Sequence, residues 1–162
     1  MVQRAGARTE LLGAADIDLP MYVPDGHNRT SESQHLVRTI ARADGLIIST
    51  PGYHGGISGL VKNALDYLED LRDAVPPYLD GTVVGCIVCA SGWQATTTTL
   101  TSLRGVVHAL RGWPSPLGVT INSEVPLLDS DGRVLNEAVA NQLEIMVQQV
   151  VEFAGLRMRA AS

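Results

Sequence analysis

The sequence predicts one α/β domain in which strands and helices alternate along 162 residues. Apolar runs such as residues 45–49 and 82–90 have the composition of buried parallel strands. Each run is followed by a stretch in which leucine and valine recur at helical spacing. The chain is long enough for one well-formed core and too short for two, so we expect residues 1–162 to form a single domain.

The expected elements follow one another in a regular order. Strands are expected at residues 8–12, 45–49, 82–90 and 117–121. Helices are expected at about residues 31–42, 59–74, 96–111 and 136–158, each with one apolar face. Ser31 and Gln34 have the spacing of a capping box at the start of the first helix.

Composition narrows the class of protein. A net charge of −5 argues against nucleic acid as the main partner. Apolar residues make up 45% of the chain, yet no run approaches the length of a membrane-spanning helix, and the first ten residues lack the apolar core of a signal peptide. We therefore expect a cytoplasmic protein without a nucleic-acid or membrane partner.

The two cysteines, Cys86 and Cys89, lie three residues apart inside the expected strand 82–90. A redox-active pair at this spacing usually opens a helix, whose N-terminus lowers the thiol pKa. On a strand, residues three apart point to opposite faces, which favours two small buried side chains instead. No second pair of cysteine or histidine residues completes a zinc site, so no metal is expected.

Two connections between a strand and the following helix are candidate ligand sites, because open α/β sheets bind ligands at the carboxyl ends of their strands. The first spans residues 50–58 and is rich in glycine, which lets backbone N–H groups approach a flat or anionic ligand closely. The second follows strand 82–90. It consists of Ser91, Gly92, Trp93 and Gln94.

The first connection and its helix resemble the active-site loop of the NAD(P)H-dependent FMN reductase family. That family typically reads Thr-Pro-Glu-Tyr-(Asn/His)-Gly-(Ser/Gly), then, after a few residues, Lys-Asn-(Ala/Ile)-(Leu/Ile)-Asp. Gly52 departs from the pattern, because glutamate is usual at that position. The matching residues are Thr50, Pro51, Tyr53, His54, Gly55, Gly56, Lys62, Asn63, Ala64, Leu65 and Asp66.

The resemblance implies a flavodoxin-like fold, a doubly wound parallel sheet in a three-layer α/β/α arrangement, with FMN as cofactor. It also implies that hydride passes from NADPH or NADH to FMN and on to a small electron acceptor, such as free flavin, a quinone, an azo compound or chromate. In the family, the first connection runs along the isoalloxazine edge and the second reaches its pyrimidine end. The expected FMN-binding residues are Pro51, Gly52, Tyr53, His54, Gly55, Gly56, Ser91, Gly92, Trp93 and Gln94.

Several of these side chains have a second interpretation. His54 could be a solvated loop residue, since the backbone there matters more than the ring. Trp93 could pack against a partner subunit, because related reductases are usually dimers or tetramers, and a homo-oligomer is expected here. Lys62 and Asp66 are four residues apart on one helix and are expected to pair at its surface. No catalytic acid or base is expected.

One family feature has no counterpart in this sequence. The family's first strand leads into a loop like Gly-Ser-x-Arg that holds the FMN phosphate, and no Gly-Ser-x-Arg occurs here. We therefore expect the sheet to lack its first strand, and FMN to bind weakly unless residues upstream of Met1 are restored. The alternative function is a flavodoxin-like subunit without cofactor that acts by protein association.

Overall fold

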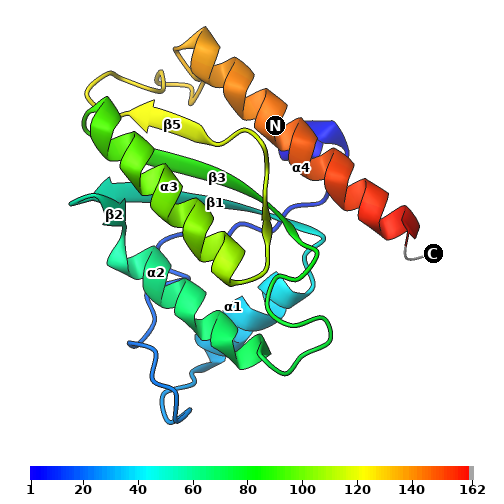
Figure 1. The fold of residues 1–162 in the computed structure, drawn as a ribbon. Helices are drawn as coiled ribbons and strands as arrows, with labels where there is room; N and C mark the ends of the chain where they lie inside the picture. The colour runs from blue at the N-terminus through cyan, green and yellow to red at the C-terminus, as the bar shows by residue number, and fades with distance from the viewer. Residues whose placement is uncertain (161–162) are drawn as a thin grey trace.

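A computed structural model describes residues 1–160 and shows a mainly parallel sheet between two layers of helices (Figure 1). The strands are β1 (Gly45–Tyr53), β2 (Gly56–Ile57), β3 (Val83–Ala90), β4 (Trp113–Pro114) and β5 (Val119–Asn122). Their order is β2-β1-β3-β4, and β5 continues along the same edge of β3 as a second parallel partner. Among the paired strands of residues 1–160, only β1 and β2 run antiparallel to each other. The expected α/β architecture is therefore confirmed.

The helices divide between the two faces of the sheet. They are α1 (Ser31–Ala41), α2 (Gly59–Asp66), α3 (Trp93–Ala109) and α4 (Glu137–Ala160), with the 3-10 helices η1 (Val2–Ala5) and η2 (Tyr67–Leu71). Helices α2 and α3 pack on one face with η2, whereas α4 and η1 cover the other (Figure 1). None of the helices within residues 1–160 is both long and apolar enough to cross a membrane.

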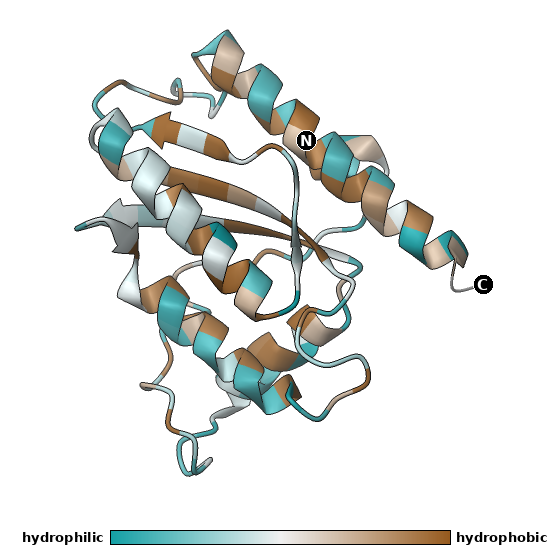
Figure 2. Ribbon diagram, viewed as in Figure 1, coloured by the Kyte–Doolittle hydropathy of each residue, from teal (hydrophilic) through white to brown (hydrophobic). Residues whose placement is uncertain are grey.

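Strand β3 is the centre of the core and is apolar along its length (Figure 2). Val84, Cys86 and Val88 join the cluster under α2 and α3, and Cys89 packs in the cluster under α4. The two thiols are free and lie on opposite faces, as expected for a strand. Burial raises the pKa of Cys86 to about 11, so this thiol stays protonated at neutral pH.

Residues 8–12 do not form the predicted strand. Leu11 is 89% exposed, and the Glu10 carboxylate lies 3.3 Å from His35 Nε2 and accepts a hydrogen bond from Thr39 Oγ1 at 3.1 Å. The segment therefore contacts α1 and pairs with no strand of the described residues. Alternating hydropathy suggested a strand, but a strand also needs a paired neighbour. Within residues 1–160, the edge of β1 opposite β3 pairs only with β2.

The start of α1 also differs from the prediction. Thr30, not Ser31, is the N-cap: its hydroxyl accepts from the Ser33 N–H at 3.2 Å. The Ser33 hydroxyl in turn donates to the Thr30 carbonyl at 3.0 Å. The predicted box was therefore one residue out of register, since serine and threonine at adjacent positions are equally good caps.

The segment that leads into α1 is tied to α2 by hydrogen bonds to its backbone. Asn63 Oδ1 accepts from the Tyr22 N–H at 2.8 Å, and Asn63 Nδ2 donates to the carbonyls of Leu19 and Pro20 at 3.2 and 3.1 Å. The Tyr67 hydroxyl donates to the Pro20 carbonyl at 2.8 Å. Buried Asn63 thus uses its whole amide to hold a segment more than 40 residues away.

A partly buried ion pair fastens the same segment to η2. The Arg29 guanidinium donates from Nε and Nη2 to the two carboxylate oxygens of Asp70, at 2.6 and 2.8 Å. It also lies 4.4 and 5.1 Å from the ring centres of Tyr22 and Tyr67. Hydrogen bonding to Asp70 raises the pKa of Arg29 above its ordinary value, so the guanidinium keeps its charge across the physiological range.

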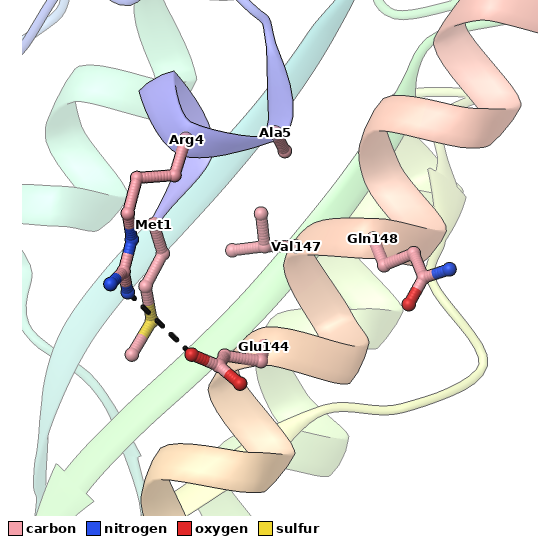
Figure 3. A pocket seen from close by; sticks show the side chains of 6 residues that line it. All are labelled: Met1, Arg4, Ala5, Glu144, Val147 and Gln148. Atoms are coloured by element: carbon pink, nitrogen blue, oxygen red, sulfur yellow. Dashed lines mark ion pairs between the residues drawn. The ribbon is translucent and has the colours of Figure 1, made fainter.

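A small hollow of about 260 Å³ separates η1 from α4 (Figure 3). Arg4 and Glu144 point toward each other across it, with Nη2 and Oε1 3.5 Å apart. Both side chains are exposed, so this pair adds less than about 1 kcal/mol. Val2 of η1 packs into the apolar cluster under α4 and anchors η1 there.

Candidate flavin site

The predicted loop at residues 50–56 is largely a β-hairpin. Strand β1 was expected to end at residue 49, but it continues to Tyr53, which pairs with Gly56 of β2. His54 and Gly55 form the two-residue turn, with φ of 50° and 83°. Positive φ at both positions is the pattern of a type I′ turn, the favoured connection of a twisted hairpin. Pro51 and Gly52 accordingly lie in the strand.

The hairpin is closed at its base by a buried threonine. Thr50 Oγ1 accepts from the Ser58 N–H at 3.1 Å, and Ser58 Oγ accepts from the Val61 N–H at 3.2 Å as the N-cap of α2. These two bonds fix where the hairpin ends and the helix begins. Farther along α2, Lys62 and Asp66 pair at 2.5 Å, which confirms the predicted surface ion pair.

A cleft of about 480 Å³ lies between the hairpin turn and the start of α3. It joins the two connections that the sequence singled out, at the carboxyl ends of β1 and β3. Five of its seven lining residues were expected; the other two, Ala95 and Thr98, lie on α3 and were missed. The lining consists of His54, Gly55, Ser91, Gly92, Gln94, Ala95 and Thr98.

The other expected site residues lie outside the cleft lining. They are Pro51, Gly52, Tyr53, Gly56 and Trp93. Gly52 lies beneath α3, where a Cβ atom would come within 2.7 Å of Thr99 Oγ1. Tyr53 and Trp93 are 61% and 62% exposed, next to the turn and in the first turn of α3.

Backbone N–H groups border this cleft without protein partners. Within the described residues, no acceptor takes the N–H of His54 or Gly55. Helix α3 begins after Gly92, which has φ of 81° and no side chain to cap the first turn. The N–H groups of Gln94 and Ala95 therefore stay available, as the first N–H groups of a helix do without a cap.

Asn122, the last residue of β5, and Glu124, two residues farther on, support the second connection and were missed from the sequence. Asn122 Oδ1 accepts from the Gly92 N–H at 3.1 Å, and Glu124 Oε1 accepts from the Ser91 hydroxyl at 2.8 Å. Hydrogen bonds from Ser91 and then Asn122 lower the pKa of Glu124 below its usual range. Their position could have identified them as candidate site residues, since they follow the strand predicted at residues 117–121 and strand ends are where such sheets bind ligands.

This lining fits the edge of a flat ring rich in hydrogen-bond acceptors. A Cβ atom built on Gly55 would meet only Thr98 Cγ2, at 4.0 Å, so the backbone there is open to a ligand. Within residues 1–160, no group of three or more His, Cys, Asp or Glu side chains could hold a metal ion. A parallel sheet with a donor-lined cleft at its carboxyl edge is the arrangement of a nucleotide- or flavin-binding α/β protein.

The chain belongs to the NADPH-dependent FMN reductase family, whose sequence model matches residues 1–125. It is 40% identical over 95 residues to an NADPH azoreductase from a Bacillus species, covering 58% of this chain and 50% of the relative. It is 33% identical over 117 residues to an FMN-dependent NADPH-azoreductase from Staphylococcus haemolyticus, and this match covers 70% of this chain and 58% of the relative. The chain thus spans about half the length of the curated relatives it matches.

Solved structures confirm the flavodoxin-like fold. RosB, solved with the bound intermediate 8-demethyl-8-formylriboflavin-5′-phosphate, superposes with a TM-score of 0.79 at 16% identity. The match covers 98% of this chain and 69% of RosB. At this identity the likeness concerns the fold alone.

Proposed function

We propose that this protein is an FMN-dependent oxidoreductase that takes hydride from NADPH or NADH and passes it to a small acceptor. The single observation that carries the proposal is the cleft between the 54–55 turn and the start of α3, at the carboxyl ends of β1 and β3. Family membership and the azoreductase names of two relatives support redox chemistry on FMN. Azo compounds are the first acceptors to test, followed by free flavin, quinones and chromate.

The protein's part in this chemistry is to bind and orient. FMN, when bound, supplies the hydride acceptor and donor. The free N–H groups of His54 and Gly55 would lie along the ring edge, where donors favour an electron-rich ring. Residues 91–94 would border the opposite end. No side chain in this arrangement is required as an acid or base.

The activity is tested with purified protein, FMN, NADPH and an azo dye. We expect the dye to lose its colour only when protein, FMN and NADPH are all present. FMN titration by fluorescence quenching, run in parallel, measures binding independently of turnover. Failure to oxidise both NADPH and NADH under saturating FMN, with every acceptor named above, would contradict the proposal.

Gly55→Val is expected to weaken FMN binding at least tenfold. Valine is strained at φ of 83°, and its branched side chain would stand between the turn N–H groups and the ring. Gly26→Val is a matched control, because Gly26 has φ of 77° and open space around it in a turn that does not line the cleft. Equal FMN affinity in the two variants would show that the 54–55 turn is not the flavin edge.

We further propose a cytoplasmic homo-oligomer, dimeric or tetrameric, as in related reductases. Trp93, 62% exposed beside the cleft, is a candidate contact residue. Light scattering at micromolar concentration is expected to give at least twice the chain mass of 17.3 kDa. A mass of one chain at that concentration would refute this part of the proposal.

A further inference from the structure

The side chain of Asn122 has a fixed orientation. Its Oδ1 accepts two backbone hydrogen bonds, from Gly92 at 3.1 Å and from Glu124 at 3.0 Å. Only an oxygen can accept both, so Nδ2 must point the other way, where it donates to Glu124 Oε2 at 3.2 Å. Asn122 therefore occupies one end of the Glu124 carboxylate and uses the N–H of Gly92.

The other end of the Glu124 carboxylate fixes the hydroxyl of Ser91. An ionised carboxylate only accepts hydrogen bonds, and the lowered pKa of Glu124 keeps it ionised at neutral pH. The 2.8 Å contact between Ser91 Oγ and Glu124 Oε1 thus consumes the only hydroxyl proton of Ser91. What Ser91 offers to the cleft that it lines is a pair of acceptor lone pairs.

Ser91 and Gly92 therefore differ from the donor groups that line the rest of the cleft. The hydroxyl proton of Thr98 is also taken, by the Gln94 carbonyl at 2.9 Å, so it is not a donor to a ligand. Backbone donors remain at the 54–55 turn and in the first turn of α3. At the Ser91 end, the hydroxyl proton and the Gly92 N–H are both occupied.

We propose that Glu124, acting through Ser91, makes this cleft selective for a ring that presents an N–H donor at the Ser91 end. Glu124 is a positioning residue, and Ser91 is the side chain that meets the ligand. The inference rests on the proposed function, since an isoalloxazine ring carries acceptors at N5 and O4 and one donor, N3–H, at its pyrimidine end. A ring whose N3–H is replaced would leave Ser91 facing a group that cannot donate.

The test compares the dissociation constants of FMN and N3-methyl FMN for each protein form. The ratio of the two constants within one variant cancels any general loss of stability. For the wild-type protein we expect FMN to bind about tenfold more tightly, the effect of one hydrogen bond. For Ser91→Ala the ratio is expected to fall close to one.

Glu124→Gln gives the sharper result. Asn122 Nδ2 is a donor, so the substituted glutamine turns its amide oxygen toward Asn122. Its amide nitrogen then faces Ser91 and donates to the Ser91 hydroxyl. The Ser91 proton is then free to point into the cleft, and the preference for FMN is expected to fall to one or below. A purely steric effect of the methyl group would instead persist, because Ser91 keeps its size. Glu137→Gln, outside this network, should retain the tenfold preference.

The possible results distinguish failure of this inference from failure of the proposed function. Equal binding of both flavins by the wild-type protein, or a preference unchanged in Glu124→Gln and Ser91→Ala, would overturn the inference and leave the proposed function standing. Absence of FMN binding by the wild-type protein would overturn both.

Discussion

Gly52→Ala is expected to destabilise the protein by about 1–3 kcal/mol, the usual range for an overpacked interior position. An added Cβ atom would lie 2.7 Å from Thr99 Oγ1 and 3.0 Å from Ala90 Cβ. Ala90 is fixed on β3, and a rotation of Thr99 leaves its Cβ atom only 3.3 Å from the added atom, so we expect α3 to move away from the hairpin. Since α3 carries one wall of the cleft, FMN affinity is expected to fall as well.

Thr99→Ala supplies the matched test. It removes the oxygen that makes the closest contact, while its Cβ atom, 3.3 Å from the added Cβ, is retained. In urea unfolding, the double variant is expected to lose less stability than the sum of the two single variants. If the two stability losses add exactly, contact with Thr99 on α3 is not the cause of the loss in Gly52→Ala.

Arg29→Lys is expected to lower the free energy of unfolding by about 2–3 kcal/mol, despite the retained charge. Lysine cannot make the paired Nε and Nη2 bonds to Asp70, and it loses the planar stacking over Tyr22 and Tyr67. The Arg29 side chain is only 15% exposed, so water replaces these contacts poorly.

Arg72→Lys is the control for the Arg29 experiment. Arg72 pairs with Glu69 on the same 3-10 helix segment, but its side chain is 66% exposed. Such a surface pair contributes little to stability, so the change should barely shift the urea midpoint. Equal effects of the two substitutions would contradict the structural role of the Arg29 cluster.

The strands and helices that bury an apolar face were predictable. Strand β3 and helices α1 and α4 begin and end within two residues of their expected bounds, because burial imposes a period that the sequence displays. The helix expected at residues 59–74 is shorter, because α2 ends at Asp66 and the 3-10 helix η2 follows to Leu71. Residues 8–12 show the limit of this reasoning, since a strand depends on a neighbour that local pattern does not reveal. The extension of β1 into a hairpin was missed for the same reason.

The candidate site was predictable in position and less so in composition. Glycine-rich turns after buried strands located both walls of the cleft, and Gly55 and Gly92 do need positive φ. The residues that line the cleft are set by the type I′ turn and by the start of α3. This helix starts at Trp93, three residues earlier than expected. Asn122 and Glu124 act through contacts 30 and 33 residues away, which no local pattern encodes.

The role of Asn63 changes how the family signature should be interpreted. Asn63 belongs to the Lys-Asn-Ala-Leu-Asp part of that signature, yet all three of its hydrogen bonds go to the backbone of residues 19–22 and none to the cleft. This part of the signature reports a folding requirement. A descendant that had abandoned flavin chemistry would still need it, so a match there measures shared ancestry.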